Sequence, residues 1–148
     1  MSLENTITEA IKTAMREKDK VALDSLRAVK AQIMLLKTEA RGAEVTPEQE
    51  IAILQRMIKQ RKDSYDQFTA QGRADLAEVE TAQMQVIEKF LPKQLTAEEL
   101  ETEISGIISE TGAESLKDLG KVMGVASKAL AGKSDGKSIS EMVKKLLS

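Results

Sequence analysis

The sequence predicts an all-α protein, with an N-terminal antiparallel helical domain over residues 1–92 and a small three-helix tail domain over residues 96–148. Aromatic residues make up only 2% of the chain, so Leu, Ile, Val, Met and Ala must fill the core. Such a core suits interdigitated helices better than a β-sandwich or barrel. The chain has only two prolines, and each stands where a helix begins or ends.

Four helices are expected in the first domain, at about residues 3–17, 20–40, 47–71 and 76–90. Asp19 can cap the second helix. The third opens with Thr46-Pro47-Glu48-Gln49, which supplies an N-cap, a proline at the first helical position and a glutamine three residues after the cap. Short connections between long amphipathic helices favour antiparallel neighbours, so the third and fourth helices should form a hairpin.

One charged residue interrupts the apolar stripe of the third helix. Arg61 stands between Ile58 and Tyr65, where the three-four repeat requires an apolar side chain. A buried guanidinium needs a carboxylate, and Glu80 on the returning helix is the candidate partner. Alternatively, Arg61 extends from the edge of the hairpin into water. Both interpretations give Arg61 an architectural role.

The domain boundary is predicted at Pro92–Leu95, and three shorter helices follow at about residues 97–111, 119–131 and 139–147. Thr96 and Glu99 form a second capping box at the start of the first of them. Gly120 and Gly124 lie four residues apart, hence on one face of the middle helix. Each weakens that helix by about 1 kcal/mol relative to Ala, and we expect them to let another backbone approach closely.

The stretch GKSDGKS at residues 132–138 looks like a phosphate-binding loop, but its spacing is wrong for one. A P-loop requires four residues between its first Gly and Gly-Lys-Ser, and here the residue at that place is Ala131. The preceding segment is also predicted to be a helix, whereas a P-loop follows a strand. We therefore expect Gly132 to end one helix and Ser138 to be the N-cap of the next.

The composition excludes several kinds of chemistry. Without His or Cys, the usual zinc sites and Cys–His or Ser–His nucleophilic systems are excluded, so neither a metal site nor a catalytic residue is predicted. No cofactor or nucleotide is expected. No run of about 18 apolar residues and no signal-peptide pattern occurs, so we expect a cytoplasmic protein with neither membrane span nor export.

Charge is distributed unevenly along the chain. From Leu116 onward there are seven lysines against three acidic residues, a net charge of +4, whereas the first 115 residues carry −6. Such asymmetry is typical of a tail that binds a polyanion. The alternative is a solvated lysine face, which is common on helical surfaces.

Six stretches, taken in order, resemble a known family: LRAVKAQI at 26–33, IKQRKDSYDQF at 58–68, GRADLAEVE at 72–80, FLPKQLTAEEL at 90–100, DLGKVMG at 118–124 and SDGKSISEMVKKLL at 134–147. No single motif is decisive, but the ordered set resembles the YqeY-like (GatB/YqeY) family over essentially the whole chain.

The resemblance implies a helical region followed by a tail, here residues 96–148, that shares its fold with the C-terminal region of the B subunit of the glutamine-dependent aspartyl/glutamyl-tRNA amidotransferase. In that enzyme the tail contacts tRNA, while glutamine hydrolysis and transamidation occur on other domains and subunits. The family label, a carbon–nitrogen ligase with glutamine as amido-N-donor, is inherited from the large enzyme. The Ser–Lys amidase machinery and the ATP-handling cradle have no counterpart in this sequence.

We therefore expect a non-catalytic accessory module whose tail binds tRNA through five lysines: Lys121, Lys128, Lys133, Lys137 and Lys144. The helix start at Ser138 would add an anion site. The tail has no aromatic residue, so recognition should depend on shape and backbone. Two alternatives stay open. One is an adaptor for an aminoacyl-tRNA synthetase, other tRNA-handling proteins or amidotransferase components, and the other is an enzyme built on carboxylates or a Ser–Lys pair.

Overall fold

The computed structural model describes residues 2–148, and its regular secondary structure over that range is entirely helical, which confirms the predicted fold class. Tertiary contacts divide the chain into two compact units, with the division between Leu91 and Pro92. We call them the first unit and the second unit and describe each separately. Whether either unit folds independently stays a prediction.

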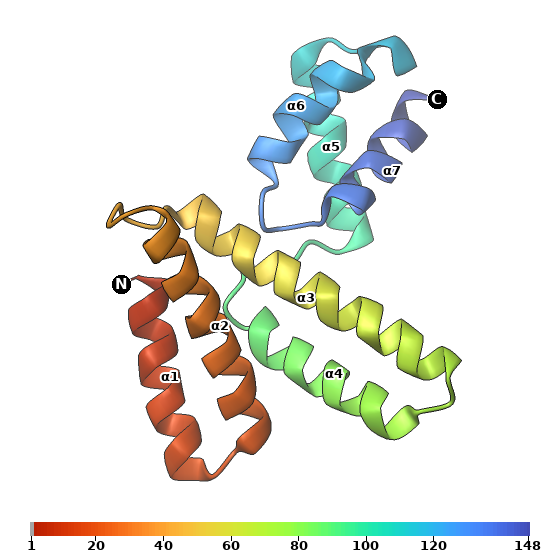
Figure 1. Ribbon diagram of the computed structural model, residues 1–148. Coiled ribbons are helices and arrows are strands. Elements are labelled where there is room, and N and C mark those ends of the chain that lie inside the picture. Colours follow the sequence, from red (N-terminus) through yellow and green to blue (C-terminus); the bar gives the residue numbers. More distant parts are fainter. Residues whose placement is uncertain (1) are drawn as a thin grey trace. The chain divides into compact units, whose positions relative to one another are not determined.

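The first unit consists of four helices: α1 (Leu3–Glu17), α2 (Lys20–Glu39), α3 (Pro47–Ala70) and α4 (Ala74–Glu88). Figure 1 shows α1 and α2 as one hairpin, and α3 and α4 as another. The Asp19 carboxylate caps α2 by accepting the backbone N–H of Ala22, as predicted. The capping box of Thr46 and Gln49 opens α3, also as predicted.

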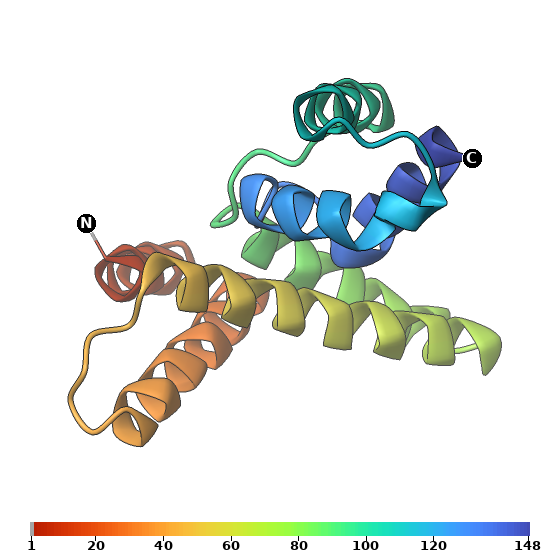
Figure 2. The ribbon, with the colours of Figure 1, turned by 90° about the horizontal axis from the view of Figure 1, so that it is seen from above.

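All four helices contribute to the core of the first unit. Its buried members are aliphatic residues and one methionine: Leu3, Ile7, Ala14, Leu26, Val29, Ile33, Ile53, Leu54, Met57 and Ile87. These residues recur at helical spacing because one stripe of each helix faces inward. Figure 2 shows that α2 and α3 diverge toward the loop that joins them. A groove lined by residues of both helices lies between them.

The second unit contains α5 (Ala97–Thr111), a short 3₁₀ helix η1 (Leu116–Asp118), α6 (Leu119–Ala129) and α7 (Gly136–Leu147). The predicted capping box of Thr96 and Glu99 opens α5, and Gly112 ends it in the left-handed conformation, at φ 69°. The buried core is wholly aliphatic: Leu100, Ile104, Ile107, Val122, Ala126, Leu130, Ile139, Val143 and Leu147.

Several predicted helix limits differ from the observed ones. The fourth helix begins two residues earlier than expected, at Ala74, and α6 ends at Ala129. The C-cap of α6 is Leu130, so the prediction that Gly132 ends this helix was wrong, although Gly132 does have the expected positive φ, at 78°. The 3₁₀ helix η1 was not predicted, since three residues are too few to show a period.

Candidate nucleic-acid interface

The outward face of α6 combines two lysines with small residues. Lys121 and Lys128 are seven residues apart and therefore point the same way, opposite the fully buried Val122 and Ala126. Six residues line one shallow surface on this face: Gly120, Lys121, Gly124, Val125, Lys128 and Ala129. Because α6 has no acidic residue, the formal charge of this surface is wholly positive.

Gly120 and Gly124 do not receive another part of the chain, so that expectation was wrong. Both glycines are exposed, and a Cβ atom built at either position would meet nothing within 4 Å. The helical periodicity correctly placed them on one face, but it gave no information on what covers that face. The two glycines leave a smooth strip of backbone open between the lysines.

The N-cap of α7 is Asp135, and the prediction of Ser138 in that role was wrong. The Asp135 carboxylate accepts the backbone N–H of Ser138 at 2.8 Å, so the helix begins at Gly136 and Ser138 lies inside its first turn. An Asp side chain caps a helix at least as well as Ser, and it here gains an additional turn. A carboxylate already occupies this helix start, which therefore does not offer an open anion site at Ser138.

Lys137 and Lys144 lie on the outward face of α7, again seven residues apart. The opposite face packs into the core through residues spaced four apart: Ile139, Val143 and Leu147. Glu141 lies between the two lysines, and Lys145 lies next to Lys144. The outward face of α7 is thus basic, but less uniformly so than that of α6.

Lys133 lies on the loop between α6 and α7, which the linker after Pro92 holds in place. The backbone N–H of Leu95 donates to the Lys133 carbonyl at 2.9 Å, and the Gln94 amide donates to the Gly132 carbonyl. The Lys133 side chain itself is exposed. The loop therefore has a fixed path while its ammonium group stays accessible.

The five tail lysines differ in how free they are. The Lys121 ammonium donates to the Thr111 carbonyl at 2.8 Å, at the end of α5, where the helix dipole favours a cation. The ammonium groups of Lys128, Lys133, Lys137 and Lys144 make no ion pair or hydrogen bond with any other described residue. The ammonium groups of four of the five predicted lysines are thus available to bind a ligand.

Charge in the second unit is separated by helix, a feature that sequence reasoning missed. α5 contains five glutamates and no basic residue: Glu98, Glu99, Glu101, Glu103 and Glu110. Together α6 and α7 carry five lysines against one glutamate. The signal was present in residues 97–111, but counting the charge from Leu116 onward left that helix out.

Arg61 pairs with a neutral amide, so the predicted Arg61–Glu80 ion pair was wrong. The Nε atom of Arg61 donates to the Gln83 side-chain oxygen at 3.0 Å, and Nη1 donates to the Met57 carbonyl at 3.2 Å. Arg61 is only half-buried, so water can solvate the rest of the guanidinium and no carboxylate is required. Its role is to join α3 and α4.

Comparisons with known proteins bear on the whole chain. The model of a family described as Yqey-like protein matches residues 4–147. Among curated relatives are proteins named "Altered inheritance of mitochondria protein 41, mitochondrial" from Pyrenophora tritici-repentis (29% identical over 93% of this chain), Meyerozyma guilliermondii (36% over 59%) and Clavispora lusitaniae (30% over 70%). The alignments span 76%, 45% and 61% of those proteins' own lengths.

Crossing a bilayer as a helix requires about 20 consecutive, mostly apolar residues. Within residues 2–148, no helix combines the length and the apolar character needed to do so.

Proposed function

Since the chain belongs to the Yqey-like protein family, we propose that it is a non-catalytic accessory module that binds tRNA through the lysines of its second unit. The observation that carries this proposal is the separation of charge within that unit. The outward faces of α6 and α7 are basic, while α5 is acidic. A polyanion is attracted to one side of such a unit and repelled from another, so the separation sets an orientation as well as an affinity.

The chemistry of these side chains suits phosphate rather than base recognition. All basic residues of the second unit are lysines, which bind phosphate as point charges without the planar fork of arginine. Residues 92–148 contain no aromatic side chain on which a base could stack. Binding should therefore follow the backbone shape of a folded RNA. Isolated affinity should be in the range of about 10⁻⁴ to 10⁻⁶ M that is typical of non-specific contacts.

Titration of labelled tRNA at two salt concentrations tests the proposal. Wild-type protein should bind at low salt and lose affinity steeply as salt rises, because each phosphate contact releases counterions. The triple variant Lys133→Ala, Lys137→Ala, Lys144→Ala should bind more weakly. Its log–log salt slope should be shallower by about 0.7 to 0.9 for each phosphate that the variant no longer binds.

A matched control separates site-specific binding from general charge. The triple variant Lys20→Ala, Lys59→Ala, Lys62→Ala removes three exposed helical lysines from the first unit and changes net charge equally. It should leave both affinity and salt slope close to wild type. Equal weakening by the two triple variants, or no binding of tRNA even at low salt, would overturn the proposal.

The second candidate is a protein-interaction adaptor for an aminoacyl-tRNA synthetase or other tRNA-handling protein. The names of the relatives refer to inheritance of mitochondria and contain no reference to RNA, which favours keeping this candidate. If the protein binds no tRNA at any salt concentration, the adaptor becomes the favoured candidate. The catalytic alternative predicts ammonia release from glutamine by the pure chain, and we expect none.

A cytoplasmic location is part of the same proposal, because tRNA is abundant there. The printed names of the relatives include the word mitochondrial. A fluorescently tagged full-length protein, imaged in its native cell, distinguishes a cytoplasmic from an organellar location.

A further inference from the structure

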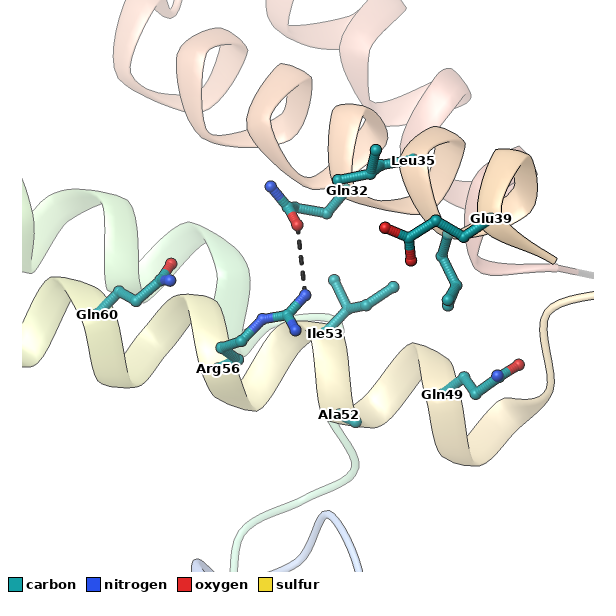
Figure 3. A pocket seen from close by; sticks show the side chains of 9 residues that line it. Gln32, Leu35, Glu39, Gln49, Ala52, Ile53, Arg56 and Gln60 are labelled. Atoms are coloured by element: carbon teal, nitrogen blue, oxygen red, sulfur yellow. Dashed lines mark hydrogen bonds between the residues drawn. The ribbon is translucent and has the colours of Figure 1, made fainter.

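The groove between α2 and α3 lies in the first unit and plays no part in the proposed RNA binding. It has a volume of about 460 Å³, and its floor includes Ile53, which is almost fully buried. Figure 3 shows Gln60 at one end, the pair of Gln32 and Arg56 next to it, and Glu39 and Gln49 at the other end. Gln32 and Glu39 are seven residues apart on α2, so they are separated by about 10 Å along that helix.

The two halves of the groove carry opposite charge, one through Arg56 and the other through Glu39. In one half, Nη2 of Arg56 donates to the Gln32 side-chain oxygen at 3.3 Å, and no carboxylate of the described chain pairs with this guanidinium. At the other end, the Glu39 carboxylate makes no ion pair or side-chain hydrogen bond within residues 2–148. The helices thus hold an unneutralised cation and an unneutralised anion about two turns apart.

Between these charges the groove wall is apolar and exposed. Leu35 lines the groove and is 52% exposed, and its neighbour Met34 is 47% exposed. Two adjacent large apolar side chains in water are unfavourable at about 25 cal/mol per Å² of exposed apolar surface. A partner that covered Leu35 would recover that free energy.

The shape of the groove limits the class of partner. A small-molecule site typically encloses most of its ligand, and an open trough between two helices does not. A peptide that binds as an added strand needs a free sheet edge, and the described chain has only helices. A polyproline II segment binds in an aromatic-lined groove, and no aromatic residue lines this one. A helix satisfies its own backbone groups and needs only an apolar stripe against Leu35 and Ile53.

We propose that this groove binds an amphipathic helix of a partner protein. About two turns of that helix contact the groove, with apolar residues at positions i, i+4 and i+7. An acidic side chain lies at the end near Arg56 and a basic one at the end near Glu39. Opposite charges at the two ends select for a partner helix of mixed charge over one of uniform charge.

Two synthetic peptides test the inference. Each is about 16 residues long, is held helical by a staple on its outer face, and carries leucines at i, i+4 and i+7. One peptide flanks this stripe with Glu at one end and Lys at the other. The second has Glu at both ends. Binding is followed by NMR, through the amide shifts of residues 32–39 and 49–56.

Wild-type protein should bind the mixed-charge peptide about three- to fivefold more tightly than the all-acidic one, the size expected for exposed ion pairs. The variant Glu39→Lys has two cationic ends and should reverse this preference. Leu35→Ser should weaken binding of both peptides about tenfold, because the leucines of the peptide then meet a hydroxyl in place of an apolar side chain. Met15→Ser removes a similarly exposed methionine on α1 and should change neither affinity.

Three outcomes would overturn the inference. The first is no shift with either peptide at millimolar concentration. The second is binding that Leu35→Ser leaves unchanged, and the third is a preference that Glu39→Lys does not reverse. These results are independent of the tRNA titration, because none of the variants alters the second unit.

Discussion

The basic residues of the two units differ in type and in the ion pairs that they form. All six arginines lie in the first unit, and the ion pairs Lys12–Glu9, Lys37–Glu4 and Arg73–Asp75 all form there. The basic residues of the second unit are all lysines, and Lys128, Lys133, Lys137 and Lys144 have no such partner in the described chain. In the second unit the lysines gather on α6 and α7, apart from the glutamates of α5. Electrostatic binding is therefore expected at the second unit.

Truncating one buried isoleucine in each unit should give the largest effect and test whether the units are separate. Ile33 in α2 and Ile104 in α5 are at most 2% exposed, so replacement of either by Ala should cost about 2 to 5 kcal/mol. The smaller second unit has less stability to lose, about 0.05 to 0.15 kcal/mol per residue. Ile104→Ala should therefore abolish the α5–α7 contribution to circular dichroism while the first unit stays helical.

Ile33→Ala should instead lower the unfolding midpoint of the first unit and leave the tail folded. One cooperative transition, shifted equally by both variants, would show that the chain unfolds as a whole and that the two units are not separate.

Replacing the two glycines of α6 by alanine should stabilise the second unit. Since a Cβ meets nothing at Gly120 or Gly124, replacement of each by Ala should add about 0.5 to 1 kcal/mol. If RNA contacts this face, the double variant should nevertheless bind tRNA more weakly. Gly106→Ala on the acidic helix α5 is the matched control, because that position is also exposed and open.

Gly106→Ala should raise the unfolding midpoint without changing affinity for tRNA. Unchanged affinity in the Gly120→Ala, Gly124→Ala double variant would exclude close approach of RNA to α6.

The two capping boxes allow the same change to be made in both units. Thr46→Ala and Thr96→Ala each remove a side chain that accepts a backbone N–H, so each should cost about 1 kcal/mol. In a domain of about 60 to 100 residues this lowers the melting temperature by about 4 to 8 °C. Thermal denaturation should show the Thr96→Ala shift in the tail only, and a shift in both units would contradict separate folding.

The smallest expected effect is a difference in acid sensitivity between these boxes. The Thr96 backbone N–H, and then its hydroxyl, hold the pKa of the Glu99 carboxyl below its ordinary value of 4.5. A lowered folded-state pKa gives stability that is present above the unfolded-state pKa and is lost as pH falls through the folded-state pKa. Gln49 occupies the corresponding place in α3 and does not titrate.

Acid titration of unfolding should therefore show an extra loss of tail stability below about pH 4.5, which Glu99→Gln removes. An identical acid profile for wild type and Glu99→Gln would show that the capping interaction contributes nothing measurable.

The helices were largely predictable because their ends carry strong local signals. Asp19, Thr46 and Thr96 each cap a helix where the sequence indicated. The start of α7 was mispredicted because two caps compete within four residues, and Asp135 gains an additional turn that Ser138 cannot. The start of α4 has no side-chain cap at Arg73, so no local signal marked it.

The candidate site was predictable in its spacing but not in its surroundings. The seven-residue interval between Lys121 and Lys128 places both on one face of any helix. What lies beside Gly120 depends on tertiary packing, and the helical periodicity of the sequence does not predict it. The same limit explains Arg61, because Glu80 and Gln83 are one turn apart on α4 and only the packed hairpin decides between them.

The bonds that hold the α6–α7 loop have a consequence for proteolysis. Trypsin cuts after Lys or Arg, but only where it can draw several residues into its active site in extended form. At Lys133, cleavage requires breaking the bond from Leu95 and displacing Gln94. Arg41 is exposed at φ 52°, and its turn is bonded only to the end of α2. A brief digest should therefore cut the chain after Arg41 before it cuts after Lys133.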